Sequence, residues 1–254
     1  IYGSEQVTNG DFSQTGAELV TNGDFATDTD WNKGTGSTIS GGYLNHSGAT
    51  ASDTTQYIPI SEKEYRLEYT IVSGTGSVRF WSNINAITPA KQSGVGTYVH
   101  YFTYDSSIGT DGRFAIALYD DISIDNVSVK ELGQDWVLGT GWSIGEDKAV
   151  ANTTGNYVNL YQNLTFVVGK TYKTTFTISD YTQGSVRLTE NGYDISGFQN
   201  AVGTYTTYFT ASQTALYMQG YESFIGSITN ISVKEVGQDW TLGSGTTIGD
   251  GIAN

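Results

Sequence analysis

The chain has 254 residues, of which 32 are Gly, 18 are Tyr and none is Cys; 12 basic residues against 26 acidic ones give a net charge of −14. The absence of cysteine excludes disulfide frameworks, thiolate metal sites and thiol nucleophiles. The charge argues against a nucleic-acid partner or an anionic membrane surface, because Lys and Arg dominate both kinds of binding. No run reaches the roughly 20 apolar residues that are needed to cross a bilayer.

A short motif is duplicated close to the start of the chain. The sequence VTNGDF occurs at 7–12 and again at 20–25. We predict a partial repeat over 1–18, because the first complete module begins after it. An isolated strand cannot bury its own face. Fragments of this kind therefore predict either a longer polypeptide, which we favour, or pairing with a neighbouring unit.

Strands are predicted almost throughout. Apolar and polar residues alternate with a period of two at 65–71, at 113–119 and at 172–178, and Gly-, Asn- and Ser-rich breaks separate such runs. No stretch shows a sustained helical period. About eight short strands per module are typical of a sandwich or jelly roll. The fold class is therefore all-β.

One change of register is visible at the end of the first module. Ile124 lies on one face of its strand, whereas Val127 continues the apolar pattern on the opposite parity, which predicts a β-bulge at 125–126. The second module shows the same switch between Ile228 and Ile231.

A tandem repeat is the strongest signal in the sequence. NVSVKELGQDW at 126–136 returns as NISVKEVGQDW at 230–240, with nine of eleven positions identical, and VGTYVHYFT at 95–103 returns as VGTYTTYFT at 202–210. We therefore predict two tandem jelly-roll β-sandwich modules with partial modules at both ends. The predicted boundaries are 19–133 and 134–237, with the start of a truncated third repeat at 238–254.

These motifs resemble the carbohydrate-binding-module type of jelly roll. The resemblance is carried by the VTNGDF opening, by a Trp soon after it (Trp31, Trp136), and by the closing strand ISIDNVSVKEL. It implies that the first and last strands lie side by side in one sheet. A Trp kept in both copies is interpreted as a core or edge anchor.

The tandem, Gly-, Thr- and Tyr-rich form also resembles modules in the fibre and decoration proteins of bacterial viruses. That resemblance implies a location on the virion surface or another extracellular location. It also implies other virion or fibre subunits as partners, a homo-oligomer among them.

No catalytic site is predicted, so the chain is not expected to be an enzyme. His46 and His100 have no copies in the second module, and no nucleophile or phosphate-loop motif appears. Glycosidases need two positioned carboxylates. Glu62, Glu64 and Glu68 have no acidic counterpart in the aligned strand, and we interpret them as solvated charges.

Outward-facing aromatic, Arg and Gln residues are candidates for binding carbohydrate, because flat rings stack on sugars while polar groups bind hydroxyls. Alternation along the strands places the candidates on the face opposite the core. They are Arg79, Trp81, Tyr101, Arg113 and Tyr119 in the first module and Arg187, Tyr208, Tyr217, Gln219 and Tyr221 in the second. The alternative is that these rings cover the sheet or pack against a neighbouring module.

The resemblance also implies a structural calcium ion where the first and last strands meet. Asn22, Asp24 and Asp125 stand at the matching places, and hard oxygen ligands suit Ca²⁺. Thr229 replaces Asp125 in the second module, so the site is confined to the first module. The alternative is a turn at Asn-Gly-Asp and a bulge capped by Asp125. No other cofactor is predicted.

The predicted function is that of a non-enzymatic structural or adhesive module array of a virion. Such an array would be a tail or head fibre or a capsid decoration protein that binds host surface glycans. The alternative is a carbohydrate-binding appendage of a secreted bacterial enzyme or of a cell-surface adhesin.

Overall fold

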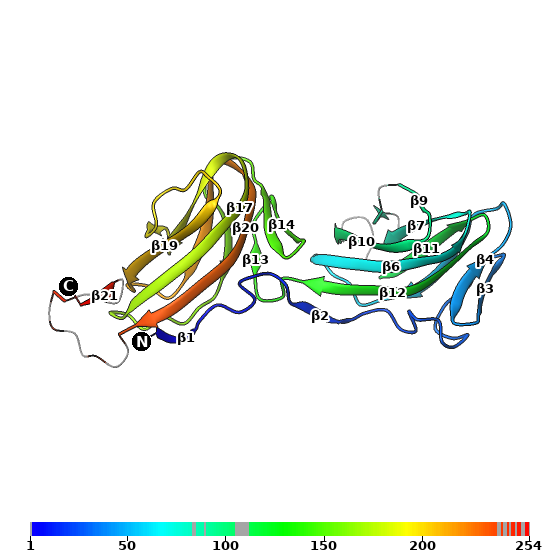
Figure 1. Ribbon diagram of the computed structural model, residues 1–254, viewed down its shortest axis with the longest axis horizontal. Coiled ribbons are helices and arrows are strands. Elements are labelled where there is room, and N and C mark those ends of the chain that lie inside the picture. Colours follow the sequence, from blue (N-terminus) through cyan, green and yellow to red (C-terminus); the bar gives the residue numbers. More distant parts are fainter. Residues whose placement is uncertain are drawn as a thin grey trace. The chain divides into compact units, whose positions relative to one another are not determined.

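The computed structural model describes residues 2–82, 85–88, 90–104, 112–237, 240, 243, 245–246, 248–249 and 252–253. Within them the chain is all-β, which confirms the predicted fold class. This described part contains no helix that is long and apolar enough to cross a membrane. It divides into two compact units (Figure 1). We call residues 15–132 the inserted unit, and residues 1–14 together with 133–254 the enclosing unit.

The inserted unit is a sandwich of two sheets. One sheet has the order β10–β6–β12–β4–β3, with β2 beside β12, and the other has the order β5–β11–β7–β8, with β9 beside β7. The strands of the first sheet are β2 (Thr15–Glu18), β3 (Ser37–Ser40), β4 (Tyr43–His46), β6 (Glu64–Gly74), β10 (Gly96–Thr103) and β12 (Ile122–Leu132). Those of the second are β5 (Ser52–Tyr57), β7 (Ser77–Ser82), β8 (Asn85–Ala86), β9 (Gln92–Ser93) and β11 (Arg113–Tyr119).

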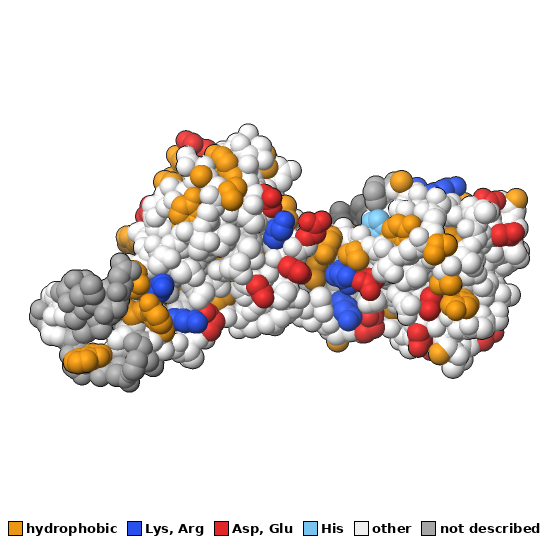
Figure 2. Space-filling model, in the orientation of Figure 1, with side chains coloured by type: hydrophobic (Ala, Val, Ile, Leu, Met, Phe, Trp, Pro, Cys, Tyr) orange, Lys and Arg blue, Asp and Glu red, His pale blue; other side chains and the backbone are white. Residues whose placement is uncertain are grey.

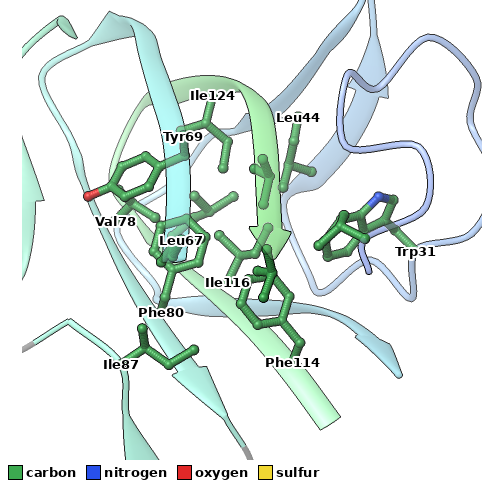
Figure 3. Close-up of a cluster of buried hydrophobic side chains, with 14 of the residues drawn as sticks. Trp31, Leu44, Leu67, Tyr69, Val78, Phe80, Ile87, Phe114, Ile116 and Ile124 are labelled. Carbon is green, nitrogen blue, oxygen red and sulfur yellow. The ribbon is translucent and has the colours of Figure 1, made fainter. Parts of the chain in front are cut away.

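Apolar side chains from both sheets meet in one core (Figure 3). Leu67 and Tyr69 come from β6, Phe80 from β7, and Phe114 from β11, and all four are fully buried. The rings of Tyr69 and Phe80 pack at 4.4 Å between centroids. Along β7 the inward residues are buried and the outward ones are half-buried. This alternation is what a sheet with one face on a core produces.

The enclosing unit repeats this plan with two long, bent strands, which are visible as the curved arrows in Figure 1. β17 (Thr171–Glu190) corresponds to β6 and β7 joined, and β20 (Leu216–Val236) to β11 and β12 joined. Register shifts between 178 and 185 mark the bend in β17, where it crosses from one layer to the other.

The remaining strands of this unit attach along those two. Because β17 and β20 run through both layers, hydrogen bonding connects them all into one nine-stranded sheet. The other members are β1 (Tyr2–Glu5), β13 (Val137–Leu138), β14 (Trp142–Gly145), β15 (Lys148–Asn152), β16 (Val158–Gln162), β18 (Tyr193–Asp194) and β19 (Gly203–Thr210). The predicted third repeat at 238–254 lies largely outside the described residues, apart from a short pairing of β21 (Ile248–Gly249) with β22 (Ile252–Ala253).

The unit boundaries differ from the predicted ones at the start of the chain. Residues 1–18 were predicted as a separate partial repeat, but β1 pairs with β20, with Tyr2 opposite Val236. In the same way β2 pairs with β12, with Thr15 opposite Leu132. Each opening segment is therefore the first strand of a unit, and the inserted unit interrupts the enclosing unit. A pairing between residues this far apart leaves no local signal in the sequence.

The predicted bulges are confirmed. Asn126 has a φ of 53° at a register shift between Asp125 and Ser128. Asn230 has a φ of 54°, opposite the shift between Thr175 and Thr177. In both strands the bulge returns the apolar residues to the core side.

The charged side chains are dispersed on the face that Figure 2 shows. Figure 2 shows acidic and basic side chains in small groups over both units on the visible face. On this face the acidic side chains are spread out and are not gathered into one patch.

Candidate functional site

Four of the five candidates in the inserted unit share the outward face of the β5–β11–β7 sheet. We call this set, Arg79, Trp81, Arg113 and Tyr119, the Trp81 face. The guanidinium of Arg79 lies 4.4 Å from the centre of the Trp81 ring, and Arg79 Nε donates to the carbonyl of Thr88 at 3.2 Å. This contact fixes a cation over an aromatic ring.

Small residues on the neighbouring strand make room for these two side chains. Ala115 stands opposite Trp81 in the register, and Ala117 stands opposite Arg79. Both alanines are buried although they point away from the core. Two long side chains therefore lie flat over the sheet, where larger residues in β11 would lift them.

The two ends of the Trp81 face are charged. Lys91 Nζ lies 3.5 Å from the centre of the Tyr119 ring at one end. At the other end Arg113 Nη2 donates to Asp53 Oδ2 at 3.3 Å. The face thus presents aromatic surface bordered by groups that form hydrogen bonds.

The equivalent face of the enclosing unit carries a row of polar side chains across four strands. Arg187 on β17 donates from Nε and Nη2 to Gln219 Oε1 on β20, at 3.1 and 2.8 Å. Its Nη1 donates to Asp194 Oδ2 on β18 at 3.3 Å, and Gln219 Nε2 donates to Asn159 Oδ1 on β16 at 3.1 Å. Each member is held by its neighbours.

Aromatic rings surround this polar row. The Arg187 guanidinium lies 4.7 Å from the Phe198 ring centre and 5.7 Å from that of Tyr157. Tyr221 packs against both rings, at 4.8 and 5.2 Å between centroids. Tyr157 is 54% exposed and Phe198 is 44% exposed, so both rings remain open to a ligand. We call the rings and the polar row together the Arg187 face.

The Arg187 face also contains Tyr217, whose ring packs on Tyr161 at 4.9 Å. Sequence reasoning named Arg187, Tyr217, Gln219 and Tyr221 but missed five other members of the face, among them Asp194 on the short strand β18. Three of them, Tyr157, Asn159 and Tyr161, alternate along one short stretch, and that alternation is the signal that could have found them. Phe198 lies in the loop between β18 and β19, where no period marks it.

Tyr101 and Tyr208 do not belong to these faces. The prediction that Tyr101 joins Trp81 is wrong, because β10 pairs with β6 in the opposite sheet and places Tyr101 beside Arg66. Tyr208 on β19 likewise stands opposite Lys173 in the first half of β17. The error came from taking the next strand in sequence as the neighbour in the sheet.

The three predicted calcium ligands are engaged in their own loops. Asn22 Oδ1 accepts from the backbone N–H of Thr27 at 3.2 Å, and Asp24 Oδ1 accepts from that of Ala26 at 3.3 Å. Asp125 Oδ1 accepts from Asn126 N at 2.7 Å. Among the described residues, no three His, Asp or Glu side chains gather as metal ligands do. These hydrogen bonds fit the alternative of a turn and a bulge capped by Asp125, and calcium binding at these residues stays a prediction.

The titratable residues considered for catalysis have structural roles in the inserted unit. Glu64, which was expected to be solvated, is buried and accepts from Thr103 Oγ1 at 2.7 Å. His46 is buried, with its Nδ1 3.2 Å from Ser37 Oγ. Burial lowers the pKa of His100, which lies beside Tyr69.

Comparison with known proteins identifies remote structural likenesses. No protein-family model matches the chain, and no curated protein matches it. The N-terminal CBM22-1–CBM22-2 tandem domain of Paenibacillus barcinonensis Xyn10C aligns with 88% of this chain and 99% of its own, at 9% identity and a TM-score of 0.32. A Paenibacillus xanthan lyase aligns with 83% of this chain at 14% identity and a TM-score of 0.28, and the alignment spans 25% of the lyase.

A third structure, an anti-sigma factor domain-containing protein, aligns with 82% of this chain and 84% of its own, at 10% identity and a TM-score of 0.23. At these TM-scores a likeness assigns neither family nor ligand. The function is therefore argued from the residues themselves.

Proposed function

We propose that the chain is a non-enzymatic module array that binds glycans through the Trp81 face and the Arg187 face. The observation that carries the proposal is the Arg187 face, where half-exposed rings flank a guanidinium, two amides and a carboxylate. The C–H faces of a pyranose pack on aromatic rings, while its hydroxyls need both donors and acceptors. Arg187 supplies donors, Asp194 supplies acceptors, and Asn159 and Gln219 supply both.

The rigidity of the face supports the same function. Arg187 is tied to Gln219 and Asp194 by three hydrogen bonds and is only 15% exposed, so little side-chain entropy remains to be lost on binding. The Trp81 face, on the corresponding sheet of the inserted unit, has an Arg and a ring in direct contact as well. Two faces on one chain raise the apparent affinity for a repeating polymer.

Binding is tested on a panel of immobilised polysaccharides with the full chain. A variant with both Trp81→Ala and Arg187→Ala should lose retention at least tenfold on any polysaccharide that holds the wild-type chain. The matched control carries Tyr101→Ala and Tyr208→Ala, which alter the opposite sheet and should leave retention unchanged. Circular dichroism shows whether both variants keep the fold. Equal retention by the two folded variants would refute the assignment of the faces.

For the biological setting we propose a fibre or decoration component of a virion, displayed on the particle surface. Tandem modules that share near-identical motifs support a structural and adhesive role. Sedimentation of the chain and binding to purified particles test it. Assembly into a homo-oligomer or docking on a capsid supports this setting. A monomer that does not bind virion particles but is retained on an insoluble polysaccharide supports the alternative of an appendage on a secreted enzyme or adhesin.

A further inference from the structure

The opening segments of the two units are nearly the same peptide. Residues 2–12 (YGSEQVTNGDF) and 15–25 (TGAELVTNGDF) share eight of eleven positions. Each begins as a strand beside the last strand of its unit, β1 on β20 and β2 on β12. Each ends in a turn, in which Phe12 N donates to Asn9 O and Phe25 N donates to Asn22 O. In the enclosing unit, the opening segment is separated from the rest of the unit in sequence by the whole inserted unit.

The N-terminal part of each opening segment is held on its unit by a glutamate of the segment itself. Glu18 Oε2 accepts from Ser128 Oγ at 2.5 Å, and Oε1 accepts from Val129 N at 2.9 Å. Glu5 Oε2 accepts from Ser232 Oγ at 2.5 Å, and Oε1 accepts from the next backbone N–H at 2.7 Å. A carboxylate that accepts hydrogen bonds from a hydroxyl and an amide is a strong and directional contact.

The middle of the segment is bound by a glutamine side chain that imitates a strand. Gln56 Oε1 accepts from Thr21 N at 2.8 Å, and its Nε2 donates to Thr21 O at 2.9 Å. Gln162 makes the same pair of bonds with Thr8, both at 2.9 Å. The glutamine amide bonds to the backbone N–H and C=O of the threonine, so this contact does not depend on the side chain at that position.

The far end is fixed by an aromatic pair. The indole Nε1 of Trp31 donates to Asn22 O at 3.0 Å, and Phe25 packs on that Trp at 5.6 Å. Trp136 donates to Asn9 O at 3.0 Å and packs on Phe12 at 5.0 Å. Phe12 and Phe25 are both fully buried.

A glycine between these anchors admits no side chain. A Cβ on Gly23 would lie 1.9 Å from the carbonyl oxygen of Val127, and a Cβ on Gly10 would lie 2.0 Å from that of Ile231. The close approach is required, because Val127 N donates to Gly23 O at 2.8 Å and Ile231 N donates to Gly10 O at 2.9 Å. We call the place that each opening segment occupies a groove. The enclosing unit's groove lies along β20 and includes Gln162 and Trp136, and the inserted unit's lies along β12 and includes Gln56 and Trp31. The two grooves therefore place the same requirements on the segment that they bind.

We infer that each groove is a receptor for an opening segment of this sequence, and that the grooves accept each other's opening segments, including those of a second copy of the chain. Three differences separate the two segments, at positions 2, 4 and 6 of the first one. The contacts given above are made by the shared residues or by the backbone. Opening segments exchanged between copies would link chains through strands that each unit already recognises.

The experiment uses the full chain with a protease site inserted between Gln14 and Thr15, both of which are exposed. After cleavage, residues 1–14 are held by non-covalent contacts alone. Fluorescent peptides of residues 2–14 and 15–27, which stand in for the segments of a second copy, are added and the protein is separated by gel filtration. Both peptides should enter the enclosing unit with affinities within about threefold of each other, while a 15–27 peptide with Gly23→Ala should bind at least tenfold more weakly.

Entry of the 2–14 peptide without the 15–27 peptide would overturn the inference, as would equal binding of the Gly23→Ala peptide. A second measurement applies if the cleaved segment does not leave its groove. The uncleaved variant Tyr2→Thr, Ser4→Ala, Gln6→Leu has two identical opening segments and should melt as the wild type does. If the enclosing unit is unfolded in this variant but folded in the wild-type chain, the two segments are not interchangeable and the inference is refuted.

Discussion

Arg79 and Arg187 stand at equivalent positions of the repeat, yet they meet different rings. Arg79 lies over Trp81, two residues along its own strand. The residue two along from Arg187 is Thr189, which is buried, and the ring over Arg187 comes instead from Phe198 in a loop. Both units therefore have an Arg stacked on an aromatic ring, although the ring comes from the same strand in one unit and from a loop in the other. This persistence favours a role for the pair itself over simple covering of the sheet.

His100 provides a test of pH dependence. Its folded-state pKa lies below the ordinary value of 6.5 because burial disfavours the charged ring. The unfolded state therefore binds a proton more readily, and stability is lost as the pH falls through 6.5 towards the folded-state pKa. His100→Thr, which copies Thr207 of the second module, should flatten this part of the curve of unfolding free energy against pH. Urea melts at a series of pH values measure it, and an unchanged slope would contradict the assignment.

Calcium is tested by thermal melting. Asn22, Asp24 and Asp125 already accept hydrogen bonds from their own loops, so we expect the same melting temperature with millimolar CaCl₂ and with excess chelator. A ligand that binds only the native state would raise the apparent stability. A rise with calcium that Asp24→Asn and Asp125→Asn together abolish would show that these side chains rearrange into a metal site.

At the scale of strands, the bend in β17 depends on one glycine. Gly184 has a φ of +73°, and a Cβ there would lie 2.7 Å from the backbone N and Cα of Phe224. Gly184→Ala should therefore destabilise the enclosing unit by more than the roughly 1–3 kcal/mol of an unfavourable φ alone. Gly192→Ala is the matched control, because Gly192 has a φ of +91° and open space around it. Equal losses in denaturant melts would mean that the bend tolerates a side chain.

Elements were predicted well where the signal is local. The alternation at 65–71 and the parity switch at 125–126 each reflect one strand against one core, and the structure has both. Tyr101 was misplaced because neighbours in a sheet are chosen by long-range pairing, which alternation does not encode. Phe198 was missed for a related reason, since a loop residue carries no period. The repeat identified the modules, but it did not reveal that one interrupts the other.

At the scale of the whole chain, the two units should differ in how readily they fold, because the inserted unit interrupts the sequence of the enclosing unit. The inserted unit is continuous, and its ends are adjacent, with Thr15 opposite Leu132. The enclosing unit needs residues 1–14, which bring the buried Val7 and Phe12 to a core formed by residues more than 100 positions later. Its folding therefore requires a long loop to close, which costs conformational entropy.

Fragments test this inequality. Residues 15–132 should melt cooperatively alone, at the temperature of the inserted unit in the full chain. Residues 133–237 should not, because the burial of Val7 and Phe12 contributes roughly 3–6 kcal/mol, a large part of the 5–15 kcal/mol typical of a domain. Calorimetry on the fragments and the full chain gives the comparison. A cooperative transition of 133–237 at its full-chain temperature would mean that the first strand is an accessory to the enclosing unit and not part of its core.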